Sequence, residues 1–275
     1  PPEVWRDEKI TEIKEHIKNG CVKKVVLARE LVLSTEKDFQ ISSVLERLSI
    51  QNKSSMIFNI DGFLGASPEL LIKRSGNSVM SHPLAGTAPK LHDADSDQTS
   101  QQKLLDSTKD AYEHKVTIEW LLNELLPFCS YVDADPEPKI VSLEHVHHLG
   151  TEVAGQLSSP PCSILELVNA LHPTPAVGGD PQTEALTIIK RVEGIDRRRY
   201  AGPVGWVAAD GDGEFAVGIR SAEVKANTAR LFAGVGLVED SDPQSELEET
   251  EAKFKTMLNT FPVSYTHLTL PTMIG

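Results

Sequence analysis

The segment from Ala201 to Val238 constrains the fold of this chain more than any other part of the sequence. Its apolar and β-branched runs are divided by Asp-Gly-Asp-Gly at 210–213, which is typical of a tight turn between two strands. Two further strands are expected between 221 and 238. Because neighbouring strands joined by short turns pair antiparallel, this segment predicts an antiparallel sheet.

Helical and extended signals alternate in blocks over the rest of the chain, without a regular βαβ repeat. Strands are expected at 23–33, 55–60, 69–73 and 78–84. Helices are expected at 7–18, 101–126, 163–171 and 183–192, with a polar linker at 92–99. A last helix is expected to begin at Asp242, because Asp is a favoured N-cap and Pro243 suits the first helical position. Strands and helices in separate blocks predict an α+β fold.

Composition limits the partners of this chain. Its 275 residues include 27 Lys and Arg against 40 Asp and Glu, a formal charge of −13. An acidic surface repels a phosphate backbone, so nucleic acid is not expected as a partner. No apolar run approaches the roughly 18 residues of a membrane span, so no membrane association is expected either. Three widely spaced cysteines indicate reduced thiols, which favours a cytoplasmic protein.

The two ends of the chain differ from the part between them. The sequence starts without Met, close to a helix-like run, and we expect the natural protein to begin further upstream. After Phe261 the chain has no charged residue and no amphipathic period, so residues 262–275 are expected to be a non-native or disordered tail. Residues 1–261 are then expected to form one domain that lacks its upstream part.

Two pairs of carboxylates lie one helical turn apart on expected helices: Asp110 with Glu113, and Glu246 with Glu249. Lys253 follows one turn later on the same face of the last helix. If the two helix faces met, four acids would converge, and Mg²⁺ would neutralise them because it prefers oxygen ligands. The alternative for each pair alone is structural. Acids near a helix start offset its dipole, and Ser107 could cap the helix that carries the first pair.

Lys24 and Glu69 are candidate acid–base residues. Strand alternation sends Lys23 and Lys24 to opposite faces, so one of them points towards whatever the sheet covers. A lysine in a partly apolar site can act as a base near neutral pH, whereas an edge-strand lysine protects against aggregation. Glu69 lies after a turn at the mouth of an apolar strand, where it is either a general acid or an exposed carboxylate.

Other motifs bear on ligand binding. Arg220 ends an apolar strand, which favours a clamp for a carboxylate or phosphate. Gly234 and Gly236 would let backbone N–H groups approach an anion, although their surroundings do not fit a dinucleotide fingerprint. The histidines at 145, 147 and 148 lack an acid or cysteine at a known zinc spacing. The run Arg197–Arg199 is interpreted as a solvated face.

Nine short motifs, taken in order along the chain, resemble the chorismate-utilising enzymes and, among these, the isochorismate synthase branch. They are KVVLAR (24–29), GASPELL (65–71), PLAGT (83–87), KDxxEH (109–114), HHLGT (147–151), LHPTPAVGG (171–179), AVGIR (216–220), AGVGLV (233–238) and ELEET (246–250). The resemblance covers nearly all of 22–261. It implies one α+β domain with large facing, mainly antiparallel sheets flanked by helices, and a site between the sheets.

The resemblance implies that water adds at C2 of chorismate while the C4 hydroxyl leaves, giving isochorismate, with Mg²⁺ as cofactor. By the same resemblance, Lys24 is the base that activates water and Glu69 is the acid that protonates the departing hydroxyl. The positions that match direct Mg²⁺ ligands are Glu113 and Glu249, supported by Asp110 and Glu246. The positions that match substrate contacts are Gly86, Thr87, His148, Ala176, Tyr200, Arg220, Gly234, Gly236 and Lys253.

Relatives of this kind differ in the nucleophile that they add to chorismate. They also differ in whether the product of that addition reacts further. Those that use ammonia usually lack a lysine at position 24 and need a glutaminase subunit, so Lys24 favours water and no glutaminase partner is expected. Salicylate synthases go on to eliminate pyruvate, but they typically carry Thr where this chain has Ala176. Salicylate synthesis therefore stays an alternative.

The same resemblance implies two finer expectations. The turn at 211–215 is more similar to isochorismate synthases that feed 2,3-dihydroxybenzoate and siderophores than to those that feed menaquinone. Family members extend upstream of Pro1, so a truncated domain that binds chorismate without turnover is a further alternative. The family also suggests a monomer.

Overall fold

Long antiparallel sheets form the frame of the structure. The computed structural model describes residues 1–261 and 268–269, and every strand pair within them is antiparallel. The largest sheet has seven strands, in the order β11 (Gly179–Asp180), β1 (Lys24–Ser34), β15 (Thr228–Leu237), β14 (Ser221–Lys225), β3 (Phe63–Ser67) and β2 (Met56–Ile60), with β16 (Leu268–Thr269) beside β1. The four strands expected within 201–238 form two antiparallel pairs, but they do not share one sheet: β14 and β15 lie in this sheet, and the strands at 203–207 and 213–217 lie in the next one.

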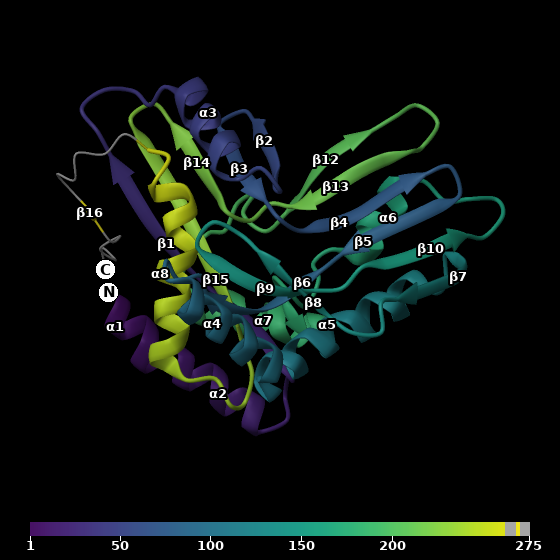
Figure 1. The fold of residues 1–275 in the computed structure, drawn as a ribbon, viewed down its shortest axis with the longest axis horizontal. Helices are drawn as coiled ribbons and strands as arrows, with labels where there is room; N and C mark the ends of the chain where they lie inside the picture. The colour runs from purple at the N-terminus through teal and green to yellow at the C-terminus, as the bar shows by residue number, and fades with distance from the viewer. Residues whose placement is uncertain (262–267, 270–275) are drawn as a thin grey trace.

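Two further sheets complete the frame. The six-stranded sheet runs in the order β12 (Pro203–Val207), β13 (Gly213–Val217), β4 (Leu70–Ser75), β5 (Ser78–His82), β10 (Val153–Leu157) and β7 (Cys129–Ala134). The three-stranded sheet runs β6 (Leu84–Pro89), β9 (Val146–Gly150) and β8 (Lys139–Ser142). In Figure 1 the two large sheets spread apart, and the small sheet lies between them. This arrangement confirms the predicted α+β class with mainly antiparallel sheets.

Helices cover the sheets. At the N-terminus α1 (Pro2–Val4), a π-helical turn (Trp5–Lys9) and α2 (Ile10–Lys18) run on from one another, and the others are α3 (Ile41–Gln51), α4 (Ala94–Asp106), α5 (Thr108–Leu125), α6 (Ile164–Leu171), α7 (Gln182–Val192) and α8 (Pro243–Leu258). In Figure 1, α8 crosses the seven-stranded sheet, where it packs against β15. The N-cap predicted for the last helix is confirmed, because the Asp242 side chain accepts a hydrogen bond from the Ser245 N–H. No helix in the described residues is long and apolar enough to cross a membrane.

Strand alternation divides β1 and β15 into two faces. Val25 and Leu27 of β1 pack in an apolar core with Val235 and Leu237 of β15 and with residues of α2 and α7. The residues between them face the opposite way. The candidate site lies on this opposite face of the sheet, which carries Lys24.

Two predictions for the region between the sheets were wrong. The expected polar linker at 92–99 is largely helix, because Asp93 caps α4 by accepting a hydrogen bond from the Ser96 N–H. The single helix expected at 101–126 is two helices, which meet at Ser107. Ser107 has an extended backbone, with ψ of 113°, and its side chain accepts the Asp110 N–H as the N-cap of α5.

Several elements had no clear sequence signal. Helix α3, strand β3 and strands β6 to β11 were not predicted. Strands β7 and β8 are short and mostly exposed or half-buried, so they lack the apolar alternation that marks a strand. The division into a domain over 1–261 and a tail over 262–275 stays a prediction, and apart from 268–269 the tail lies outside the described residues.

The cap at Ser107 generates a stability prediction. We expect Ser107→Ala to lower the free energy of unfolding by about 1 kcal/mol, because the first turn of α5 loses its side-chain acceptor. Urea unfolding measures this. Ser49→Ala is the matched control, because Ser49 is exposed within α3 and caps no helix. Equal stability of the two variants would contradict the role of Ser107.

Candidate active site

Lys24 lies on the inner face of β1. Its side chain is fully buried, while the neighbouring Lys23 is exposed and pairs with Asp180 at 3.0 Å. The prediction that one of the two lysines points under the sheet is therefore confirmed. Lys24 Nζ lies 3.0 Å from Glu113 Oε1 of α5 and 3.4 Å from Thr117 Oγ1. Helix α5 thus supplies the carboxylate that neutralises the buried ammonium.

Gly234 and Gly236 of β15 leave room for these side chains. A Cβ atom at Gly236 would lie 2.1 Å from Glu113 Oε1 and 2.8 Å from Lys24 Cε. A Cβ atom at Gly234 would lie 3.0 Å from the Tyr200 hydroxyl. The two glycines therefore have a steric role, in addition to the close backbone approach that the sequence suggested.

One cavity collects all the residues predicted to contact substrate, together with Glu69 and Glu113. Its lining includes Glu69, Gly86, Thr87, Glu113, His148, Ala176, Tyr200, Arg220, Gly234, Gly236 and Lys253. Lys24 is not among the lining residues and lies behind Glu113 and Gly236. Sequence reasoning missed the apolar part of the lining, which is Val26, Pro68, Leu84, Ala85, Val177 and Ile219. Each of these residues lies inside a motif quoted above, and its place in that motif was the sequence signal that could have identified it.

Glu69 is buried beside β4 and has the properties of an acid. It is 3% exposed, and burial raises its pKa to about 7, although the charges of Lys24 and Arg220 oppose this shift. The alternative of an exposed carboxylate is wrong. Near neutral pH a large fraction of Glu69 holds a proton, which a general acid requires.

Arg220 and His148 form a second polar group on the cavity wall. Arg220 Nη2 lies 2.7 Å from His148 Nε2, and His148 Nδ1 lies 2.9 Å from the Gly86 carbonyl oxygen. Burial and the charge of Arg220 hold the pKa of His148 well below its usual value, so the imidazole is neutral. From these contacts we assign the proton to Nδ1, leaving Nε2 to accept from Arg220.

One hydrogen-bond donor of the Arg220 side chain has no partner in the described residues. This donor is the buried Nε. The Arg220 backbone has φ of 49°, in the left-handed region that an arginine rarely adopts. An unsatisfied donor on a buried arginine at a cavity wall supports the predicted clamp for an anionic group.

The four predicted metal-binding carboxylates of α5 and α8 lie close enough to influence one another's charge, but three of them pair with lysines. Besides the Lys24–Glu113 pair, Lys109 Nζ lies 2.5 Å from Glu246 Oε1, and Lys253 Nζ lies 2.6 Å from Glu249 Oε1. Asp110 accepts hydrogen bonds from the Thr87 N–H and from Ser107. As arranged, no group of three or more His, Cys, Asp or Glu within 1–261 and 268–269 could hold a metal ion. Lys109 was missed, although it precedes Asp110 in a quoted motif.

The charges of these carboxylates are only partly balanced. Burial and the neighbouring Glu249 raise the pKa of Glu246 to about 7, and Glu246 Oε2 has no hydrogen-bond partner in the described part of the chain. Burial also raises the pKa of Asp110, and the charges of Glu113 and Glu249 add to that shift. A buried carboxylate oxygen without a partner, in a set of oxygen donors that repel one another, fits a hard divalent cation.

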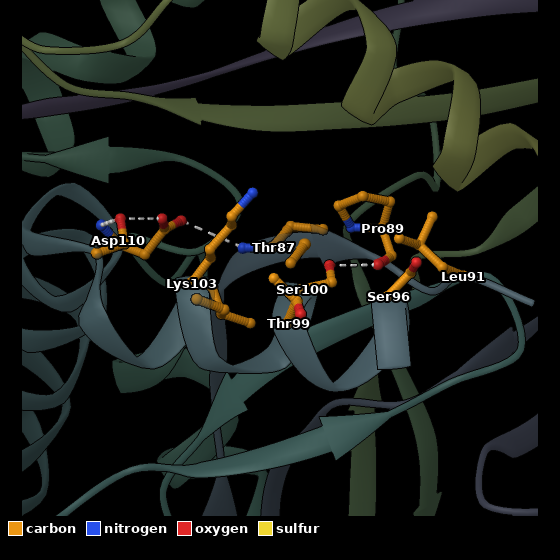
Figure 2. Close-up of a pocket in the computed structure, with 11 residues that line it drawn as sticks. Thr87, Pro89, Leu91, Ser96, Thr99, Ser100, Lys103 and Asp110 are labelled. Carbon is orange, nitrogen blue, oxygen red and sulfur yellow. Dashed lines mark hydrogen bonds between the residues drawn. The ribbon is translucent and has the colours of Figure 1, made fainter. Parts of the chain in front are cut away.

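A larger groove of about 510 Å³ opens beside the cavity, between β6 and α4. Figure 2 shows its lining, with Thr87 joined to Asp110 at one end and Ser100 joined to Pro89 at the other. Its walls are mainly hydroxyl and apolar side chains, with Lys103 and Asp110 as the charged residues. We place the site in the smaller cavity, because the buried acid and the buried arginine converge there.

Comparison with known proteins was made by sequence and by structure. The profile of a family described as "Chorismate binding enzyme" matches residues 1–261. "Isochorismate synthase MenF" of Bacillus subtilis is 42% identical over 247 residues, 88% of this chain and 52% of that protein. "Isochorismate synthase DhbC" of Bacillus subtilis is 40% identical over 260 residues, 90% of this chain and 65% of that protein. This chain therefore spans about half to two thirds of the length of these curated relatives.

A solved structure shows the same fold. The crystal structure of DhbC from Bacillus anthracis aligns with a TM-score of 0.90 and 41% identity, over 94% of this chain and 72% of that one. The MenF and DhbC relatives of Bacillus subtilis differ by only two points in identity, so the expected 2,3-dihydroxybenzoate type stays a prediction.

The raised pKa of Glu69 generates a pH prediction. Between its ordinary value of 4.5 and about 7, the folded protein retains a proton that the unfolded chain has released. The contribution of Glu69 to the free energy of unfolding therefore falls as pH rises through this window. Glu69→Gln cannot ionise, so we expect it to gain about 2 kcal/mol relative to wild type between pH 5 and pH 8.

Urea unfolding of both proteins at the two pH values tests this expectation. Glu36→Gln is the control, because Glu36 is exposed. If the stability difference between Glu69→Gln and wild type is the same at both pH values, the buried acid is not protonated as described.

Proposed function

Because this chain belongs to the chorismate-binding enzyme family, we propose that it converts chorismate to isochorismate. The family that the nine motifs indicated is confirmed by the profile match and by relatives at about 40% identity. These curated relatives are named isochorismate synthases. We assign the same activity to this chain because of the site described above.

One observation carries the proposal: a buried, partly protonated glutamate lines the cavity, and a buried lysine lies directly behind the cavity wall. The charge of Lys24 lowers the pKa of Glu69, so the two groups lie within electrostatic reach of each other. In the proposed reaction Lys24 acts as the neutral amine: after its ammonium has released a proton, it takes a proton from water as the water oxygen bonds to C2. Glu69 gives its proton to the C4 hydroxyl, which leaves as water. One water enters and one leaves, so the reaction is an isomerisation.

The cations of the cavity would hold the two carboxylates of the substrate. Arg220 offers its unpartnered Nε, and neutral His148 fixes the orientation of the guanidinium. Lys253 lies at the wall from α8, where its Nζ also donates to the Gly234 carbonyl oxygen at 2.8 Å. Local cations of this kind attract a dianion even though the chain as a whole carries −13.

We also propose that Mg²⁺ is the cofactor. Glu113 and Glu249 would hold it directly, and Asp110 and Glu246 would support them. Bound there, Mg²⁺ would supply positive charge for a substrate carboxylate. The lysines that neutralise these carboxylates would then be free to face the substrate, and Lys253 already lines the cavity.

Product analysis tests the proposal and its alternatives. The protein is incubated with chorismate and Mg²⁺, and the products are separated by chromatography. Isochorismate supports the proposal, whereas salicylate with pyruvate would support a salicylate synthase. Chorismate binding in calorimetry without any product would support a truncated binding domain. A monomer without a glutaminase subunit, and a cytoplasmic location, belong to the same proposal.

The base assignment predicts the effect of Lys24→Met, which keeps most of the side-chain volume. Isochorismate formation should fall by about 10²- to 10⁴-fold, because the water loses its proton acceptor. Mg²⁺ affinity should be retained, since Lys24 is not a metal ligand. Lys23→Met is the control, because Lys23 is its exposed neighbour. Full activity of folded Lys24→Met would refute the assignment.

The metal assignment predicts the effect of Glu249→Gln. Calorimetric titration with Mg²⁺ should show an affinity at least about tenfold below that of wild type, because a charged oxygen ligand is lost. Glu251→Gln, an exposed position on the same helix, should bind Mg²⁺ as wild type does. Chelation with EDTA should stop isochorismate formation, and added Mg²⁺ should restore it. Unchanged Mg²⁺ affinity in Glu249→Gln would contradict the ligand set.

A further inference from the structure

Arg197 is not part of a solvated face, so the prediction made for Arg197–Arg199 is wrong at this position. Only 18% of its side chain is exposed, against 54% for Arg198. Arg197 faces Glu193, whose side chain is 2% exposed. The guanidinium donates from Nε to Glu193 Oε1 at 2.7 Å and from Nη2 to Glu193 Oε2 at 2.5 Å. This is a bidentate ion pair that is largely removed from water.

The Arg197–Glu193 pair supplies hydrogen-bond partners along the part of the β1 edge that β11 does not cover. Strand β11 pairs only with Lys24 and Val25 on this side. Beyond that point, Arg197 Nη2 donates to the Val26 carbonyl oxygen at 2.8 Å, and the Ala28 N–H donates to Glu193 Oε2 at 2.7 Å. These side chains therefore take the hydrogen-bonding positions that a neighbouring strand would fill.

The same pair joins three segments that reach the candidate site. Strand β1 carries Lys24, two residues before Val26. Arg197 Nη1 also donates to the Val177 carbonyl oxygen at 2.7 Å, next to Ala176 of the cavity lining. The guanidinium lies 5.9 Å from the ring centroid of Tyr200, another lining residue. Arg197 itself does not line the cavity.

Burial works against the charge of Arg197, but the hydrogen bonds and charge of Glu193 outweigh it and raise the pKa of the guanidinium. The guanidinium therefore keeps its positive charge despite its burial. Its hydrogen bonds go to backbone carbonyl groups or to Glu193, and none is directed into the cavity. Its contacts fix the placement of backbone segments relative to one another.

We propose that Arg197 and Glu193 are positioning residues for the proposed reaction, which hold the Lys24 strand, the Ala176–Val177 loop and Tyr200 in register around the cavity. This inference rests on the proposed function. Misplacement of a reacting group by about 1 Å lowers a rate by roughly 10²-fold. Arg220 and Lys253 lie on other segments, so substrate attraction should persist when the pair is removed.

The test measures kcat and KM for isochorismate formation with wild type, Arg197→Met, Arg197→Lys and the double variant Arg197→Met/Glu193→Met. Folding of each is first checked by circular dichroism. The double variant leaves no unpaired buried charge, so it keeps the test open if Arg197→Met alone does not fold. Arg198→Met is the matched control, because it removes the exposed arginine next in sequence.

We expect kcat of the folded Met variants to fall by about 10²-fold while KM stays within about threefold of wild type. Arg197→Lys should recover only a small part of the loss, because an ammonium cannot reproduce the forked contacts. The control should match wild type. If wild type makes no isochorismate, the proposed function fails and this inference fails with it.

If wild type is active, three other results overturn the positioning role alone. The first is a kcat near that of wild type in a folded variant. The second is a loss confined to KM, which would make the pair a determinant of binding. The third is failure of every variant of Arg197 to fold, which would make the pair a requirement of folding only.

Discussion

A charged amine buried inside a sheet is the constraint on which the rest of this structure depends. Strand alternation places Lys24 on the inner face of β1, where it is fully buried. Removing an ammonium from water is unfavourable by several kcal/mol unless a carboxylate meets it with good geometry. Glu113 must therefore lie against β1, and α5 must cross this face. Gly236 must lack a side chain, because a Cβ there would clash with both groups.

The same requirement organises the carboxylates around that pair. Each of Glu113, Glu246 and Glu249 pairs with a lysine. The three pairs join β1 to α5, join α5 to α8, and lie within α8. The three lysines leave one of the four carboxylate charges unbalanced. Burial, together with the charges of neighbouring carboxylates, raises the pKa of both Glu246 and Asp110. Negative charge is concentrated in this region, and seven acids with no base lie between Glu239 and Glu251. The acidity that argued against nucleic acid is thus concentrated around the start of α8, where the metal site is proposed.

The sequence predicted the parts of the fold whose pattern is set by burial. Strand β1 and the strands after Ala201 were predicted from runs of apolar and β-branched residues, and the cap of α8 was predicted from Asp242. Helix α4 was not, because its polar side chains bury only Ser100 and Leu104 and so show no apolar stripe.

The candidate site was predicted residue by residue, but not as an arrangement in space. The quoted motifs contain every residue that lines the cavity except Tyr200 and Lys253, yet spacing alone could not bring distant segments together. Arg197 was misread for the same reason, since its partners Val26 and Val177 are remote in sequence.

Two buried arginines show why contacts, and not residue type, separate structural groups from binding groups. Arg197 directs four of its five N–H donors to Glu193 and to two carbonyl oxygens, so its role is to hold protein segments together. Arg220 donates to a neutral imidazole and keeps a buried Nε without a partner in the described residues. Glu193 and Glu246 differ in the same way. Glu193 accepts from Arg197 and from the Ala28 N–H, whereas Glu246 Oε2 accepts nothing in that part of the chain. An unsatisfied buried group is unfavourable in the free protein, and a ligand that satisfies it gains that free energy on binding.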